Sequence, residues 1–170
     1  MNNSILKYSA LFVILVLIQV LILNNIYFLG YINPLIYILF IFLYPIKKEK
    51  APFLIISFLL GLSIDFFSNS GGSNAAAMAL IAYLRLPILH IIQNKSEFDY
   101  LLFDIKKLSF IQMTTYILSL TFIHHIVVFS LEYYKLQGVF NILNRAFLTS
   151  LFTSLLIAFS IALFIKNKKA

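Results

Sequence analysis

Residues 61–80 read GLSIDFFSNSGGSNAAAMAL, and this stretch lies between two long apolar runs. Asp65 stands near the end of the first run and is followed by a turn of Ser, Asn and Gly residues. Glycine and asparagine adopt the left-handed backbone conformations that tight turns require. The stretch therefore predicts two membrane-length helices joined by a short turn, with one carboxylate close to that turn.

The apolar pattern continues along the whole chain. Of the 170 residues, 62% are hydrophobic and only 11% are charged, and runs of about 20 apolar residues can cross a bilayer as helices. The composition predicts an all-α polytopic membrane protein, with residues 1–170 forming one integral membrane domain. We expect a compact bundle of six transmembrane helices, with spans at residues 5–23, 31–46, 52–67, 74–92, 108–131 and 144–165.

The distribution of Lys and Arg predicts the orientation of this bundle. With six spans, one side receives Lys7, the turn at residues 47–50, Lys95, the pair at 106–107 and the C-terminal lysines. The other side receives only Lys135 and Arg145. Because cytoplasmic loops retain positive charge, we expect both termini in the cytoplasm. The net charge of +7 then reflects topology, and nucleic acid is not an expected partner.

The connection SEFDYLLFDIKK, residues 96–107, allows two interpretations. Its apolar residues recur at helical spacing, which favours a short amphipathic helix on the inner membrane surface. An ordinary loop, or the first turns of the following span, fits equally well.

Asp65 belongs to a polar stripe. Ser57, Gly61, Asp65 and Ser68 recur at spacings of four, four and three residues, so they share one helix face, as residues at helix–helix contacts in membranes do. Arg85 in the next span is a possible counter-charge for Asp65. The alternative is that Arg85 extends to the inner headgroups.

The adjacent His124 and His125 lie in the fifth span at a depth similar to that of Asp65. Their side chains point about 100° apart on a helix, which disfavours a shared metal ion, so hydrogen bonding within the bundle is the preferred interpretation. The chain has no cysteine and no phosphate-binding loop, and its serines form no recognisable nucleophile arrangement. We expect no enzyme activity, cofactor or metal.

The segment from Gly61 to Pro87 resembles the rod shape-determining MreD family. The resemblance rests on a Gly-Leu-x-x-Asp-x-x-Ser span end, an outer turn with Gly72, and two further sequences. These are Asn74-Ala75-x-Ala77 and Ala82-Tyr83-Leu84-Arg85-x-Pro87. The length and the predicted topology agree with the family more loosely. The adjacent histidines are not part of the family pattern.

The resemblance implies a non-enzymatic scaffold of the bacterial cell-elongation machinery in the cytoplasmic membrane. Its implied partner is the single-span protein MreC, and through MreC the MreB filaments, RodA and a penicillin-binding transpeptidase. The implied fold is similar to the substrate-binding subunits of energy-coupling-factor transporters. The sequence gives no indication of a homodimer. The residues expected at helix packing or partner interfaces are Gly61, Asp65, Ser68, Gly72, Arg85, His124 and His125.

Two other functions remain open at the level of sequence. In a vitamin-binding transporter subunit, the outer polar residues, such as Gln19, Asn24, Asn25 and Arg145, would line a pocket together with Asp65 and the histidines. However, the first span lacks the pair of small residues by which such subunits dock their energising partner. A membrane-embedded hydrolase would rest on His124, His125 and Asp65 alone.

Overall fold

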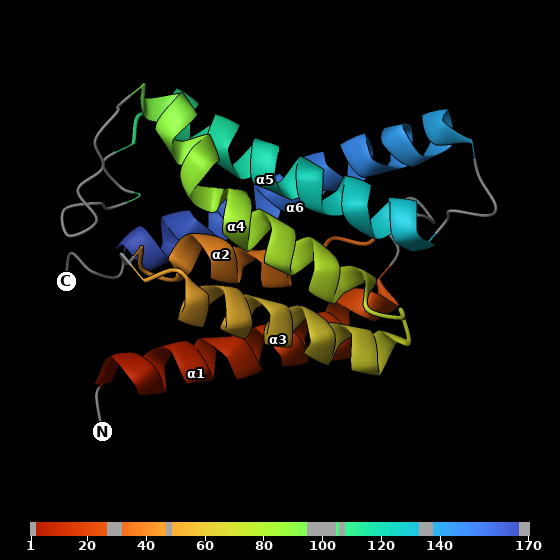
Figure 1. Cartoon of the computed structure of the whole chain (residues 1–170), viewed down its shortest axis with the longest axis horizontal. Coiled ribbons are helices and arrows are strands. Elements are labelled where there is room, and N and C mark those ends of the chain that lie inside the picture. The colour runs from red at the N-terminus through yellow and green to blue at the C-terminus, as the bar shows by residue number, and fades with distance from the viewer. Residues whose placement is uncertain are drawn as a thin grey trace.

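The computed structural model describes residues 3–26, 32–46, 49–94, 105, 108–132 and 138–166, and the side chains of residues 5–163 within these ranges. These residues are largely helical (Figure 1). The long helices are α1 (Asn3–Leu17), α3 (Ala51–Ser68), α4 (Ser73–Gln93), α5 (Phe110–Glu132) and α6 (Val139–Lys166). A π-helical turn, η1 (Ile18–Ile22), and a 3-10 turn, η2 (Leu23–Asn25), extend α1.

Five helical segments of the described chain are long and apolar enough to cross a membrane. They are Ile5–Asn25, Ala51–Ser68, Ser73–Gln93, Phe110–Glu132 and Val139–Leu163. They coincide with five of the six predicted spans. The structure thus has the helical architecture of a multi-pass membrane protein.

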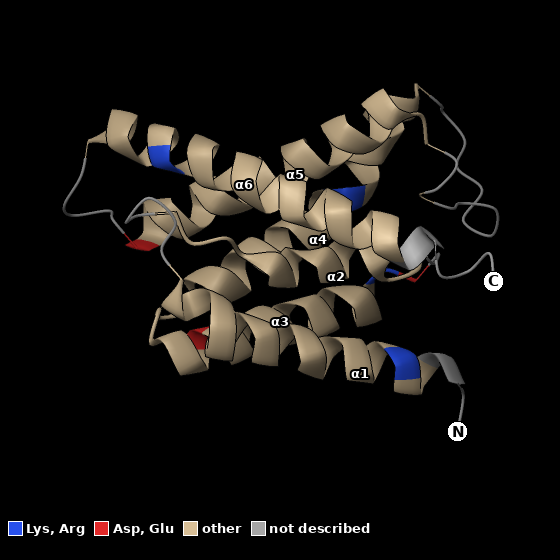
Figure 2. Ribbon diagram, turned by 180° about the vertical axis from the view of Figure 1, so that it is seen from behind, with Lys and Arg blue, Asp and Glu red and all other residues tan. Residues whose placement is uncertain are grey.

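α1 and α3 run in the same direction, whereas α3, α4, α5 and α6 alternate in direction along the bundle. α3 packs against α4, α4 against α5, and α5 against α6, while α1 lies beside α3 (Figure 1). The start of α1 and the end of α6 lie at the same end of the bundle, together with the start of α3 and the end of α4. We call this the lysine-rich end, because Lys7 and Lys50 lie there, and the opposite end the turn end, because the α3–α4 turn lies there. Charged residues are few along the ribbon (Figure 2).

The α3–α4 hairpin is built as its sequence predicts. Pro52 lies in the first turn of α3, where a missing backbone N–H costs nothing. Asn69, the residue after α3, has a left-handed backbone (φ 52°). Gly72, with φ 94°, precedes α4. Asn94 ends α4 in the same left-handed conformation, with φ 51°.

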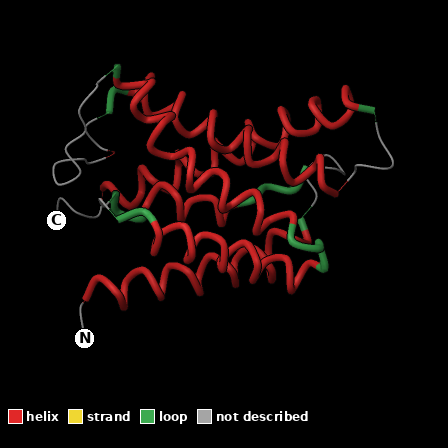
Figure 3. The backbone as a smooth tube through the Cα atoms, in the orientation of Figure 1, coloured by secondary structure: helices red, strands yellow, loops and turns green. Residues whose placement is uncertain are grey.

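The second predicted span differs from expectation. Within residues 32–46, only a 3-10 turn, η3 (Ile36–Ile38), and the short helix α2 (Leu39–Leu43) are helical. A non-helical stretch leads into them alongside the long helices (Figure 3). Eight helical residues rise only about 12 Å, well short of the roughly 30 Å hydrocarbon core of a bilayer. We call residues 36–43 the half-helix.

Burial explains how this half-helix can exist at membrane depth. Non-helical backbone is tolerated there only where protein encloses it, and residues 36–42 are at most 8% exposed. The half-helix contacts α1, α4 and α6. Its side chains, with Tyr37, Ile38, Phe40 and Ile41 completely buried, form the centre of the apolar core.

Side chains of neighbouring helices satisfy the backbone at the start of the half-helix. Gln19 accepts a hydrogen bond from the Ile36 amide (2.9 Å) and donates one to the Pro34 carbonyl (3.3 Å). Thr153 of α6 accepts one from the Leu35 amide (3.3 Å). Gln19 lies in the π-helical turn and is fully buried. The apolar first span therefore carries a glutamine because the half-helix needs a partner for its backbone.

Gln19→Leu should destabilise the protein by about 2–4 kcal/mol, since each buried backbone group left unpaired costs about 1–3 kcal/mol. The thermal unfolding of detergent-purified protein measures this effect. Asn25→Leu is the matched control, because the Asn25 amide is exposed and, among the described residues, bonds the Leu21 carbonyl one turn earlier. Equal melting temperatures for the two variants would contradict the role of Gln19.

The amphipathic segment predicted at residues 96–107 lies outside the described residues, except for Ile105. The same holds for several basic residues on which the predicted orientation depends, among them Lys47, Lys48 and Lys135.

Candidate functional site

A polar network crosses the bundle toward its turn end, and Asp65 is its most connected member. The Asp65 side chain is only 5% exposed. One carboxylate oxygen accepts hydrogen bonds from the Asn74 amide N–H (3.0 Å), the Asn74 side chain (2.9 Å) and the Ser70 hydroxyl. The other oxygen accepts one from the Ala75 amide (2.7 Å). The carboxylate of α3 therefore caps the N-terminus of α4.

This arrangement explains a charge at membrane depth without a cation. The first N–H groups of a helix have no partner within the helix, and the helix dipole makes its N-terminus partly positive. No residue of α4 caps its own N-terminus with a side chain. Asp65 supplies both the acceptors and the negative charge, so it closes the hairpin.

Gly61 lets the two helices approach closely enough for this bond set. A Cβ atom placed on Gly61 would lie 2.5 Å from the Asn74 carbonyl oxygen and 2.7 Å from the Ala75 Cα. Both are backbone atoms, which cannot move aside without shifting α4. Gly61 and Asp65, one turn apart on α3, therefore hold the same two residues of α4.

Tyr37 and His124 continue the network into the bundle. The Tyr37 hydroxyl donates to the Asn74 side-chain carbonyl and lies 3.2 Å from His124 Nε2. Since a hydroxyl has one proton, Tyr37 accepts from His124, which places a proton on Nε2 of that ring. The path from Asp65 through Asn74 and Tyr37 to His124 thus links α3, α4, the half-helix and α5.

His125 belongs to a second, separate branch. Its Nδ1 lies 2.8 Å from the Thr121 carbonyl, which can only accept, so Nδ1 donates. Its Nε2 lies 3.4 Å from the Thr153 hydroxyl. The same hydroxyl accepts the hydrogen bond from the Leu35 amide. The adjacent histidines therefore serve different partners, as their divergent directions on α5 predict.

A third branch reaches the first helix. Asn24 donates to the exposed Ser68 hydroxyl (2.9 Å), and Gln19 donates to the Asn24 side-chain oxygen (2.9 Å). Ser68 lies on the predicted stripe with Ser57, Gly61 and Asp65, but those three are buried and Ser68 is not. Ser68 joins the hairpin to α1.

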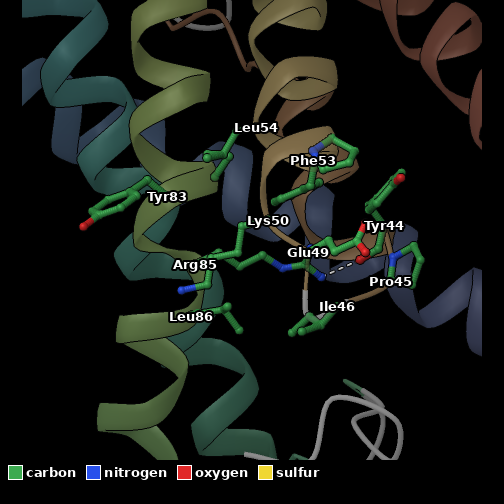
Figure 4. A pocket seen from close by; sticks show the side chains of 12 residues that line it. Tyr44, Pro45, Ile46, Glu49, Lys50, Phe53, Leu54, Tyr83, Arg85 and Leu86 are labelled. Atoms are coloured by element: carbon green, nitrogen blue, oxygen red, sulfur yellow. Dashed lines mark hydrogen bonds between the residues drawn. The ribbon is translucent and has the colours of Figure 1, made fainter.

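Arg85 lies away from Asp65, nearer the lysine-rich end. Its Nη2 donates to the Tyr44 carbonyl, and its guanidinium lies 4.8 Å from the centre of the Phe53 ring (Figure 4). Tyr44 ends the half-helix, so Arg85 places a cation at the C-terminus of that helix, where the dipole favours it. The structure thus differs from the predicted ion pair, since Arg85 bonds the end of the half-helix and Asp65 bonds Asn74, Ala75 and Ser70.

The network brings together most of the residues singled out from sequence. Gly61, Asp65, Ser68 and the turn at Gly72 lie at one junction, and His124 connects to it through Tyr37. His125 and Arg85 hold the two ends of the half-helix instead, His125 through Thr153. Sequence reasoning missed Tyr37, and it predicted Thr153 as a helix-packing residue without its bond to the Leu35 amide. The only signal for Tyr37 was its phenol hydroxyl within an apolar run.

The hydrogen bonds of this arrangement hold the start of α4 and the half-helix in place. Among the described residues, no three His, Asp or Glu side chains come close enough to hold a metal ion. Asp65 is surrounded by donors from its own hairpin. His124 Nδ1 and the Thr121 hydroxyl have no hydrogen-bond partner within the described part of the chain. Of the polar residues proposed to line a vitamin pocket, Gln19 bonds Asn24 and the backbone of the half-helix, and Asn24 also bonds Ser68. Asp65 bonds Asn74, Ala75 and Ser70.

The chain matches no protein-family model, no curated protein and no solved structure.

Proposed function

We propose that this protein is a non-enzymatic scaffold of the bacterial cell-elongation machinery, of the MreD class. It would reside in the cytoplasmic membrane with both termini in the cytoplasm, bind MreC, and through MreC help couple MreB filaments to RodA and its transpeptidase. We also propose that its fold is similar to that of the substrate-binding subunits of energy-coupling-factor transporters.

The observation that carries this proposal is the common location of the residues behind the sequence resemblance. Gly61 and Asp65 from one part of the motif contact Asn74 and Ala75 from another. The resemblance therefore covers a single packed unit, the α3–α4 hairpin, and is not a set of scattered matches. The positive-inside distribution of Lys and Arg supports the orientation.

Some motif residues present large side chains at the surface of the hairpin. Leu62 is 43% exposed on α3, and Tyr83 is 63% exposed on α4. A tyrosine exposed along a membrane helix has a hydroxyl without a partner in hydrocarbon, and helix association in membranes uses such polar groups. We assign these two side chains to the contact with MreC.

Depletion of the protein in its own bacterium should convert rods to spheres, and MreC should co-purify with it. Tyr83→Ala should reduce the recovered MreC at least about threefold while the protein accumulates normally, because truncating an aromatic anchor at an interface commonly costs more than 1 kcal/mol. Phe159→Ala is the matched control, since Phe159 is a 64% exposed aromatic on α6. Normal rods after depletion, with no MreC recovered, would refute the proposed function.

A further inference from the structure

Two hollows of different character meet at the end of the half-helix. The smaller, about 90 Å³, is lined by residues 44–46, by Glu49 and Lys50, by the start of α3 and by the middle of α4 (Figure 4). The larger, about 640 Å³, runs between α1 and α3. Tyr44 and Pro45 line both of them. The two hollows therefore share a wall and lie together toward the lysine-rich end.

The smaller hollow has the chemistry of an anion site. Arg85 lines it and is only 4% exposed. The side chains of Arg85 and Tyr116 interact through charge and hydrogen bonding, but Arg85 Nε has no hydrogen-bond partner among the described residues. A buried guanidinium with an unused N–H is a strong donor for a phosphate or carboxylate oxygen.

The charge lining this hollow is positive. Lys50 and Arg85 contribute two positive charges, and Glu49 contributes one negative charge. Lys50 and Glu49 are both exposed, at the entrance. Arg85 lies deeper, with its cation fixed by Tyr44 and Phe53. An anionic group entering past Lys50 would meet a cation that is already positioned.

The larger hollow is apolar and has the size of a ligand pocket. Its volume lies within the range of about 300–1,000 Å³ typical of such sites. Phe12 and Val13 of α1, Phe40 of the half-helix, and Ile56 and Leu59 of α3 line it. Ser9 and the two tyrosines, Tyr8 and Tyr44, provide its few polar atoms. Lys7 lies at its lysine-rich end, 5.3 Å from the centre of the Tyr8 ring.

We propose that the two hollows form one binding site for an anionic phospholipid. The headgroup phosphate would lie in the smaller hollow, with Arg85 Nε and Lys50 as donors. One acyl chain would lie between α1 and α3, passing Tyr44 and Pro45. The pairing of a cationic hollow with an adjoining apolar one fits an amphiphile, and basic pockets between membrane helices bind anionic lipid headgroups elsewhere. This inference does not depend on the proposed scaffold function.

Native mass spectrometry of the purified full-length protein tests the proposal. The probes are phosphatidylglycerol, phosphatidylcholine with the same acyl chains, and inorganic phosphate. We expect one phosphatidylglycerol per chain, bound at least about fivefold more strongly than phosphatidylcholine, because each Lys or Arg near the headgroup contributes a several-fold gain. Inorganic phosphate should not compete at equimolar concentration, since it lacks the acyl chain.

Three variants separate the two parts of the site, and two others serve as controls. Lys50→Gln should lower phosphatidylglycerol binding about threefold to fivefold, and Arg85→Gln about tenfold. Ser9→Phe should fill the larger hollow and lower the binding of both lipids. Arg145→Gln at the turn end, and Ser119→Phe on α5, are the matched controls and should bind as the original chain does. Should Arg85→Gln fail to fold, Lys50→Gln and Ser9→Phe decide, because both of these side chains are exposed.

Equal binding of the two lipids, or unchanged binding in both Lys50→Gln and Ser9→Phe, would overturn the proposal. Phosphate that competes fully, together with an unaffected Ser9→Phe, would also overturn it, because the site would then take a free anion. A partner helix occupying the groove would appear as binding of MreC that displaces the lipid and is lost in Ser9→Phe. That outcome would likewise reject the lipid as the occupant.

Discussion

Replacing Gly61 with Ala should lower the free energy of unfolding by about 2–3 kcal/mol, the cost of overpacking a close contact. The added Cβ would lie 2.5 Å from the Asn74 carbonyl oxygen, so α4 must move and the Asp65 bonds must lengthen. Helix propensity alone predicts the opposite sign, because alanine is favoured over glycine within a helix by about 1 kcal/mol. The direction of the change therefore distinguishes close packing from local propensity.

Gly138→Ala provides the same chemical change at a site where a Cβ has nothing within 4 Å. Denaturant or thermal unfolding of both variants in one detergent gives the comparison. A Gly61→Ala protein as stable as Gly138→Ala would show that the two helices are not held at the distance described.

Replacing Asp65 with Asn should cost about 2–4 kcal/mol, although the two side chains have nearly the same shape. Both carboxylate oxygens accept hydrogen bonds, one from the Ala75 amide and the other from Asn74 and Ser70. An amide group in either orientation directs N–H against one of these donors, and the helix N-terminus loses its negative partner. The melting temperature and the yield of folded protein should both fall.

Glu49→Gln is the control for this change, because Glu49 is an exposed carboxylate. A double-mutant cycle refines the test. Asp65→Asn and Asn74→Ala should be coupled by more than 0.5 kcal/mol, the threshold above which contacting residues depart from additivity, whereas Asp65→Asn and Arg85→Gln should add. A measured coupling energy between Asp65 and Arg85 would instead support the ion pair that the sequence allowed.

Much of the architecture was predictable from apolar run length. Five long helices lie where hydropathy places them, and the Ser/Asn/Gly turn ends α3 and begins α4 as turn chemistry predicts. The half-helix was not predictable in this way. Residues 35–43 are uniformly apolar, and hydropathy cannot distinguish a spanning helix from a short one that other helices enclose.

The partners of Asp65 and Arg85 were missed for a related reason. A carboxylate caps a helix N-terminus nine residues later only because the hairpin folds back on itself, and the sequence search looked for an opposite charge. Arg85 serves the C-terminus of the half-helix, so its role could not be assigned before that element was known. The roles of Gln19 and Thr153 were unpredictable for the same reason. Both side chains bond backbone groups of residues 34–36, and every residue has such groups, so the sequence does not identify the partner.

The enclosed half-helix also constrains how the chain is made. A segment that rises only about 12 Å cannot insert from the translocon as an independent transmembrane element. Thr153, which receives the Leu35 amide, is synthesised 118 residues later. The Leu35 amide therefore obtains its partner only after the last helix has left the ribosome, and chains truncated before α6 should hold residues 36–43 less firmly than the full chain does.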